Sequence, residues 1–279
     1  MKKIFALMAI AAVGFVSCSK DDGDEAAPTN PTGPTPLTVE KKNRAAVIYF
    51  GEDWCPPCGS YGGPTLDSLL SQEGTLLTGI KVNSSSNNNS LNWSPGNGMY
   101  SAFNTGVFNS ASTIPAMAVN QLKNGVTTSI GSNYNSAITK SNTFAAAPVI
   151  AGIALRKSIT GDSISVETKV KFYNATAANE DYRLAVYIVE DEVVASQSTS
   201  TSGTVANYVH SNMVRTANAG SYTGVAINNL QAITADQEFS NTYKIYLKPA
   251  WNKDKLKVVA VLWKMGTTPA TLINSNVLK

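Results

Sequence analysis

The chain contains little of the chemistry that marks metal sites or nucleic-acid-binding surfaces. Its 279 residues include only three cysteines and one histidine. A structural zinc ion takes four ligands, mostly Cys and His, and the single histidine, His210, is far in sequence from Cys55 and Cys58. Basic residues outnumber acidic ones by 22 to 19 and form no dense cluster of the kind that binds nucleic acid. We therefore expect no metal, no cofactor and no nucleic-acid partner.

The N-terminus also lacks an apolar run of about 20 residues, the length that crosses a membrane. Lys2 and Lys3 precede an apolar stretch at 4–16, which is the arrangement of a signal peptide covering residues 1–17. This stretch ends in Phe15-Val16-Ser17-Cys18, which resembles a lipobox except that Phe15 stands where leucine is usual. The resemblance implies that Cys18 is lipidated and anchors the protein to the membrane. An ordinary cleaved signal with an incidental cysteine is the alternative.

Residues 18–40 have the composition of a tether. Residues 19–25 are mostly acidic, and four prolines follow among Thr, Asn and Gly up to residue 36. Such a stretch cannot bury enough apolar surface to fold, and its prolines favour extended geometry. The acidic residues resemble the surface-export signal of Bacteroidota-type lipoproteins. We expect a lipid-anchored protein of the cell envelope, in the outer membrane, on either its periplasmic face or the cell surface.

Cysteine usage favours chemistry over structural stabilisation. With Cys18 assigned to lipid, Cys55 and Cys58 remain as one local pair. A disulfide that closes so short a loop restricts the unfolded chain little, and so contributes little stability. Half of a zinc site has the same spacing, but the other two ligands are missing. The pair is therefore predicted to be a dithiol/disulfide site.

Residues 41–146 alternate between short apolar runs and helical patterns. Leu66, Leu69 and Leu70 have the spacing of one helix face. The low-complexity segment 83–97 is predicted to be an exposed loop, with Trp93 as a small anchor or a contact residue. The predicted elements are strands at 44–50, 79–83 and 113–120, and helices at 55–72, 99–108 and 127–143.

Residues 147–279 have a different pattern, with many short strands and almost no helix. Apolar and polar residues alternate at 166–172, and Gly161-Asp162 is predicted to form a hairpin turn. Such a pattern is typical of a β-sandwich. The predicted strands are at 149–158, 163–173, 182–190, 222–228, 243–248, 256–265 and 271–277.

The segment Trp54-Cys55-Pro56-Pro57-Cys58 lies at the predicted junction of a strand and a helix. Free N–H groups and the positive end of the helix dipole favour a thiolate there, so Cys55 is the predicted nucleophile. Cys58, one turn later, is placed to attack a mixed disulfide and release the partner. Because Pro56 and Pro57 have no N–H group, the Cys58 N–H is the predicted donor to the Cys55 sulfur.

The segment from Phe50 to Cys58 resembles the active site of thioredoxin-fold proteins, and Trp-Cys-Pro-Pro-Cys occurs in tryparedoxin-like members. The resemblance implies a cis-proline beside the dithiol, which Ile114-Pro115 matches in position. It also implies that the Ile114 backbone pairs with a bound partner chain and that Pro115 shields the sulfurs from metals. The implied supporting residues are Trp54, Pro56, Pro57, Ile114 and Pro115.

Glu52, Asp53 and His210 are polar residues outside the cysteine pair that could have a functional or a structural role. Glu52 and Asp53 either help to move protons or are solvated loop residues. The buried acidic residue of thioredoxins has no secure match. His210 lies close in sequence to Arg215, but such a lone histidine is more often a packed or hydrogen-bonded structural residue, and we expect that role.

As a whole, the chain resembles the outer membrane protein 28-related lipoproteins. The resemblance rests on the lipobox, the Pro-rich tether, the dithiol and a His-x-Asn-x-Val-Arg motif at 210–215. It implies an α/β thioredoxin-like domain at 41–146 followed by an all-β sandwich domain at 147–279. It does not imply a settled activity or substrate.

Two functions are compatible with this sequence. The first is a lipid-anchored thiol–disulfide oxidoreductase whose partners are protein thiols and disulfides of the envelope. The second is a surface binding or adhesion module in which the thioredoxin-like domain is a scaffold. The oligomeric state stays open. Asp67-Ser68-Leu69 and Asp162-Ser163-Ile164 resemble an O-glycosylation signal, with Ser163 as the more accessible site.

Overall fold

The computed structural model describes residues 35–71, 76–110 and 113–279. The signal peptide, Cys18 and most of the tether therefore lie outside the described residues. Residues 37–279 form one compact unit, which is mixed α/β but mostly β and contains three sheets. No helix within the described ranges is long and apolar enough to cross a membrane.

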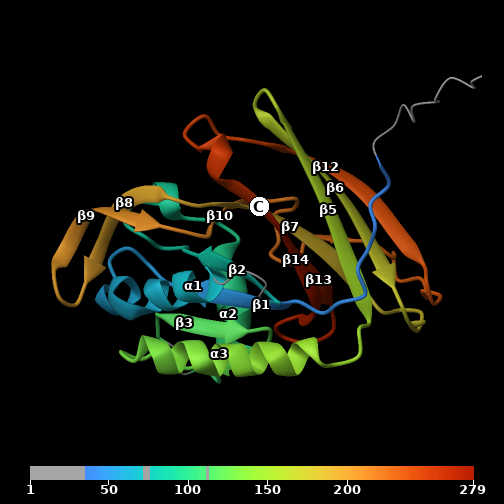
Figure 1. Cartoon of the computed structure of the whole chain (residues 1–279), viewed down its shortest axis with the longest axis horizontal. Helices are drawn as coiled ribbons and strands as arrows, with labels where there is room; N and C mark the ends of the chain where they lie inside the picture. Colours follow the sequence, from blue (N-terminus) through green and yellow to red (C-terminus); the bar gives the residue numbers. More distant parts are fainter. Residues whose placement is uncertain (1–34, 72–75, 111–112) are drawn as a thin grey trace, which may run out of the picture. The chain divides into compact units, whose positions relative to one another are not determined.

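The first part of this unit, residues 37–146, combines strands and helices (Figure 1). Its strands are β1 (Ala45–Phe50), β2 (Leu77–Val82), β3 (Ala116–Val119) and β4 (Leu122–Asn124), and its helices are α1 (Gly63–Leu70), α2 (Gly96–Gly106) and α3 (Ile130–Ala145). Strand β1 pairs in parallel with β2 and antiparallel with β3. Helices α1 and α3 cover one face of these strands through Leu66, Leu69 and Ala137, and α2 covers the other through Met99 and Phe103. The predicted elements are confirmed here, with ends that differ by a few residues.

The second part is built almost entirely from strands. They are β5 (Ala151–Thr160), β6 (Ser163–Phe172), β7 (Tyr182–Glu190), β8 (Val193–Thr199), β9 (Gly203–His210), β10 (Met213–Ala217), β11 (Val225–Ala226), β12 (Glu238–Tyr246), β13 (Leu256–Lys264) and β14 (Thr271–Leu278). The predicted strand at 222–228 is wrong in extent, since only β11 forms there. Strands β8, β9 and β10 were not predicted, because their sequences show no clear alternation of apolar and polar residues.

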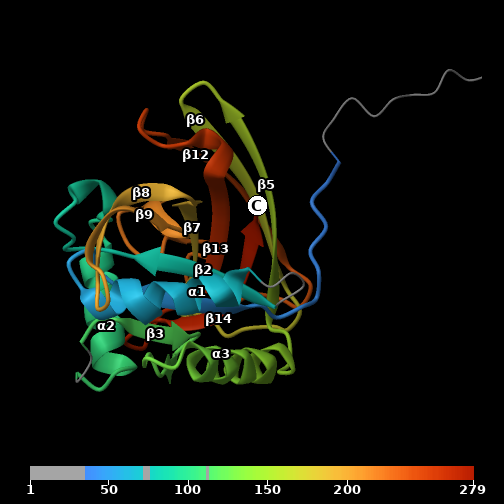
Figure 2. The same ribbon diagram turned by 60° about the vertical axis from the view of Figure 1, so that its left-hand side comes forward.

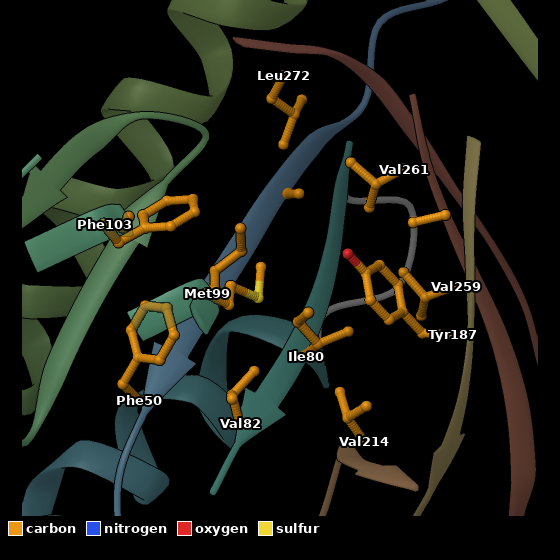
Figure 3. Close-up of a cluster of buried hydrophobic side chains, with 14 of the residues drawn as sticks. Phe50, Ile80, Val82, Met99, Phe103, Tyr187, Val214, Val259, Val261 and Leu272 are labelled. Atoms are coloured by element: carbon orange, nitrogen blue, oxygen red, sulfur yellow. The ribbon is translucent and has the colours of Figure 1, made fainter. Parts of the chain in front are cut away.

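One sheet crosses from the first part to the second, with the strand order β14-β13-β7-β10-β2-β1-β3-β4. Strands β10 and β2 join the two parts, and the Lys81 N–H donates to the Asn212 carbonyl at 2.7 Å. The core shows the same continuity: in Figure 3, Ile80 and Val82 of β2 face Tyr187 of β7. The domain boundary at residue 147 stays a prediction, but the hydrophobic core and this sheet are shared across it.

The other two sheets lie at opposite ends of the unit (Figures 1 and 2). Strands β12, β6 and β5 form a sheet whose apolar face packs on β7 and β13. Strands β8 and β9 form a two-stranded hairpin, residues 193–210, which lies beside the start of α1. Two non-glycine residues with positive φ, Glu192 and Asn212, flank this hairpin and turn the chain into and out of it.

Candidate redox site

Cys55 and Cys58 form a disulfide where β1 ends and a helix begins, with 5.2 Å between their Cα atoms. The chain is helical from Pro56, passes through a π-helical turn η1 (Cys58–Gly62) and continues into α1. The Cys58 N–H donates to the Cys55 Sγ at 3.3 Å. The donor predicted from the missing N–H groups of the two prolines is thus confirmed.

A cleft of 370 Å³ opens beside this disulfide turn. Trp54 and Ile114 contribute to its walls together with Phe50 and other residues of the first part. The Ile114–Pro115 peptide bond is cis. Pro115 lies against the helix that follows Cys58, because a Cβ atom added to Gly62 would come within 2.8 Å of the Pro115 Cβ. The structure therefore gathers the predicted supporting residues around the helix start.

Residues 83–97, the polar loop, are exposed only in part, whereas their composition predicts an exposed loop. Asn83, Ser86, Leu91 and Trp93 are all buried. Trp93 is an anchor rather than an outward contact residue, and it packs edge-on against Tyr187 at 5.6 Å between ring centroids. The prediction of exposure is thus only partly correct, because the loop finds buried acceptors for some of its backbone N–H groups.

Those acceptors are the carboxylates of Glu52 and Asp53, both buried. Glu52 accepts hydrogen bonds from the Ser84 and Ser85 N–H groups at 2.9 and 3.0 Å and from the Ser86 hydroxyl at 2.6 Å. Asp53 accepts from the backbone N–H groups of residues 87 and 88, both at 2.8 Å. The suggestion that these carboxylates are solvated is wrong, since both carboxylates organise the polar loop.

The polar loop in turn holds Trp54 in place. Its indole N–H donates to the Ser85 carbonyl at 2.9 Å, while 45 % of the residue stays exposed. An exposed aromatic ring next to Cys55 is thereby fixed in one orientation at the edge of the cleft. Glu52 acts on this ring indirectly, because it holds the same turn of the polar loop.

The β8–β9 hairpin contacts the other side of the disulfide segment, and sequence reasoning missed it. The buried side-chain amide of Gln197 donates to the carbonyls of Glu52, Asp53 and Cys55 at 3.0–3.1 Å. Gly59 allows the close approach, because a Cβ there would lie 2.5 Å from the Ser198 carbonyl oxygen. The hairpin is thus attached to the backbone on both sides of Cys55.

His210, at the end of β9, contacts the first part of the unit directly. Its Nδ1 lies 3.0 Å from the Lys81 Nζ, and both residues are buried. Burial lowers the pKa of Lys81 to about 8, although the carboxylates of Asp67, Glu52 and Asp53 partly offset this effect. Burial and the neighbouring Lys81 charge lower the pKa of His210 to about 3. The expected structural role agrees with this packing, but the partner was not predicted.

Both sulfur-bearing residues are well covered, with 3 % of Cys55 and 1 % of Cys58 exposed. Within the described residues, no group of three or more His, Cys, Asp or Glu side chains converges as a metal site would require. The site therefore offers a disulfide, a neighbouring apolar cleft and a buried ammonium–imidazole pair.

A family model described as outer membrane protein Omp28 matches residues 107–278, which is more than half of the chain. The chain belongs to this family. The predicted location in the cell envelope is confirmed by this membership. The matched range includes the β8–β9 hairpin and His210, whereas the Cys55–Cys58 pair precedes it.

Two solved structures share the fold at low sequence identity. HBP35 of Porphyromonas gingivalis superposes with a TM-score of 0.63 and 16 % identity, covering 85 % of this chain and 75 % of that protein. A protein of Agrobacterium tumefaciens from a structural genomics consortium gives a TM-score of 0.50 and 12 % identity, covering 84 % and 93 %. At such identities the likeness concerns the fold alone. No curated protein matches the chain.

Proposed function

We propose that this outer membrane family member is a lipid-anchored thiol–disulfide oxidoreductase that acts on cysteines of other envelope proteins. In this proposal residues 41–146 are a thioredoxin-like domain. The observation that carries it is the Cys55–Cys58 disulfide at a helix start, with the Cys58 N–H on the Cys55 sulfur. A donor in that position stabilises a Cys55 thiolate, both as a nucleophile and as a leaving group.

The exchange proceeds through a mixed disulfide. In the oxidised state, a partner thiolate attacks the Cys55 sulfur, the Cys55–Cys58 bond breaks, and Cys58 leaves as a thiolate. A second partner thiolate then attacks the partner sulfur bound to Cys55, forming the partner disulfide and releasing Cys55. Two electrons pass from the partner to the protein, and the two protons of the partner thiols end on Cys55 and Cys58. The reverse sequence reduces a partner disulfide.

Glutathione exchange and insulin reduction by the purified chain test the proposal. We expect reversible reduction of Cys55–Cys58, complete loss of activity in Cys55→Ser, and accumulation of mixed disulfides with envelope proteins in Cys58→Ala. Asp162→Asn, an exposed turn substitution far from the cysteines in sequence, serves as the control. A chain that neither exchanges with glutathione nor reduces insulin would refute the proposal.

One observation favours the second candidate, a surface binding or adhesion module that uses this fold as a scaffold. Cys55 and Cys58 are almost fully covered, whereas exchange needs access to sulfur. The full-length Cys55→Ser/Cys58→Ser variant separates the two functions in cells. A phenotype that survives the double substitution but is lost on deletion of the whole gene supports the scaffold. A phenotype that is lost both in the double substitution and in the gene deletion supports the oxidoreductase.

A further inference from the structure

Lys81 carries a buried ammonium group whose acceptor comes from a distant part of the chain. On β2, Lys81 is paired with Tyr49 of β1 on one side and with Met213 of β10 on the other. Only 3 % of the residue is exposed. In the part of the chain that the structure describes, no carboxylate lies within ion-pair distance of Lys81. The hydrogen-bond partner of its Nζ is the His210 Nδ1, at 3.0 Å.

The His210 ring is suited to accept this hydrogen bond. Its lowered pKa keeps the imidazole neutral at physiological pH, so Nδ1 offers a lone pair to the ammonium. A buried ammonium without an acceptor would lose its proton more readily, because burial disfavours the charged form. His210 therefore helps Lys81 to remain charged inside the protein.

Tyr49 connects this pair to the disulfide turn. The Lys81 Nζ lies 5.9 Å from the centroid of the Tyr49 ring. At the far end of the same ring, the hydroxyl donates to the Cys58 carbonyl at 3.4 Å. Gly51 and Gly62 leave room for that hydroxyl, since a Cβ on either would lie 2.5 Å from it. The ammonium is thus separated from the Cys58 turn by one aromatic ring.

Other titratable groups surround Lys81 as well. Asp67 of α1 and the carboxylates of Glu52 and Asp53 act on its charge. Tyr208 of β9 packs on His210, with 5.0 Å between their ring centroids. Burial raises the pKa of Tyr49 and of Tyr208, so both phenols are neutral below pH 10. Among these groups, Lys81 is therefore the one that titrates between pH 7 and 9, while its acceptor stays neutral.

We propose that His210 is a positioning residue for the dithiol reaction, because it holds the Lys81 ammonium behind the Cys55–Cys58 turn. There the positive charge favours the thiolate that appears when a partner thiolate opens the disulfide. Lys81 keeps its proton, so the electron and proton balance of the exchange is unchanged. The inference rests on the proposed oxidoreductase function. It gives a residue from the second half of the chain a role in that function.

The test is the equilibrium of the full-length protein with glutathione between pH 6.5 and 9.5. In Lys81→Met and His210→Leu, we expect the reduced-to-oxidised ratio at pH 7 to fall by up to about tenfold, the limit set by a rise of one unit in the thiolate pKa. The deficit should vanish well above pH 8, where wild-type Lys81 is itself neutral. His210→Asn should restore most of the ratio, since its amide oxygen can replace Nδ1 as the acceptor.

Lys264→Met is the matched control, because Lys264 is a partly buried lysine that pairs with Glu180 instead. It should leave the ratio and its pH dependence unchanged. A folded His210→Leu variant with the wild-type profile would overturn the inference. If His210→Leu does not fold, the double variant Lys81→Met/His210→Leu is measured instead, because it replaces both buried polar groups. A wild-type pH profile in this double variant would overturn the inference equally. Failure of the wild-type chain to exchange at any pH refutes the proposed function itself.

Discussion

The polar loop and the β8–β9 hairpin both pack on the segment from Glu52 to Ser60, and both supply hydrogen-bond donors, but to different kinds of acceptor. The polar loop supplies N–H and O–H donors to two buried carboxylates, whereas the donors of the hairpin, among them the Gln197 amide and the Ser198 N–H, bond to uncharged oxygens. Hydrogen bonds to a charged group are about twice as strong as neutral ones. A Ser- and Asn-rich segment can therefore be held by stronger individual hydrogen bonds than a β-hairpin.

The largest effect is expected where Arg215 attaches the polar loop to the end of β7. Arg215, just beyond the hairpin, donates to Glu190 at 2.6 Å and to the Ser90 carbonyl of the polar loop at 2.7 Å. Arg215→Met leaves Glu190 buried without its cation and should lower the free energy of unfolding by about 3–5 kcal/mol in a urea titration. Lys255→Met removes an exposed pair and should cost about 1 kcal/mol or less. Equal costs would contradict the importance of burial.

A smaller loss of unfolding free energy is expected from a substitution that affects the polar loop alone. Glu52→Gln replaces one acceptor oxygen with an NH₂ group that faces N–H donors, and should cost about 3 kcal/mol. Limited proteolysis within residues 83–97 should become faster, while cleavage in the hairpin stays at the wild-type rate. Glu40→Gln, at an exposed carboxylate paired with Arg44, is the control. Unchanged cleavage of the polar loop would show that the carboxylate does not hold it.

Gly59→Ala should weaken the attachment of the β8–β9 hairpin. The added Cβ would lie 2.5 Å from the Ser198 carbonyl oxygen and 2.6 Å from the Gln197 Cγ, so the hairpin must shift. We expect a loss of about 1–3 kcal/mol in unfolding free energy and faster hydrogen exchange in β8 and β9. Gly98→Ala in α2 meets no atom within 4 Å and should instead stabilise by about 0.5–1 kcal/mol. A neutral Gly59→Ala would mean that the hairpin is loosely seated.

The smallest effect concerns pH. Between pH 8 and 10, unfolded Lys81 retains its proton while folded Lys81 loses it, so stability should rise with pH through this window. One proton contributes a slope of at most about 1.4 kcal/mol per pH unit. Lys81→Met should remove this part of the slope in urea titrations at several pH values. The same slope in both proteins would contradict the lowered pKa.

The local structure around the cysteines could be predicted from the sequence. The buried run 45–50, the leucine spacing of α1 and the missing N–H groups of Pro56 and Pro57 are local properties, and each predicted its outcome correctly. The partial burial of the polar loop could not be predicted, because it depends on carboxylates that precede it by some thirty residues. The hairpin had a weak signal, a Ser-rich turn ending at Gly203 with positive φ, but no apolar alternation beside it.

The sequence by itself determined the redox-capable pair, the helix start beneath it and the donor to the Cys55 sulfur, because each depends on neighbours within one turn. Only the tertiary structure decided what surrounds that pair. Strand β10 beside β2 brings His210 to Lys81, and the hairpin brings Gln197 to the Cys55 backbone. Such contacts join residues more than a hundred positions apart. They arise because a shared sheet and core fix the two parts of the chain against each other.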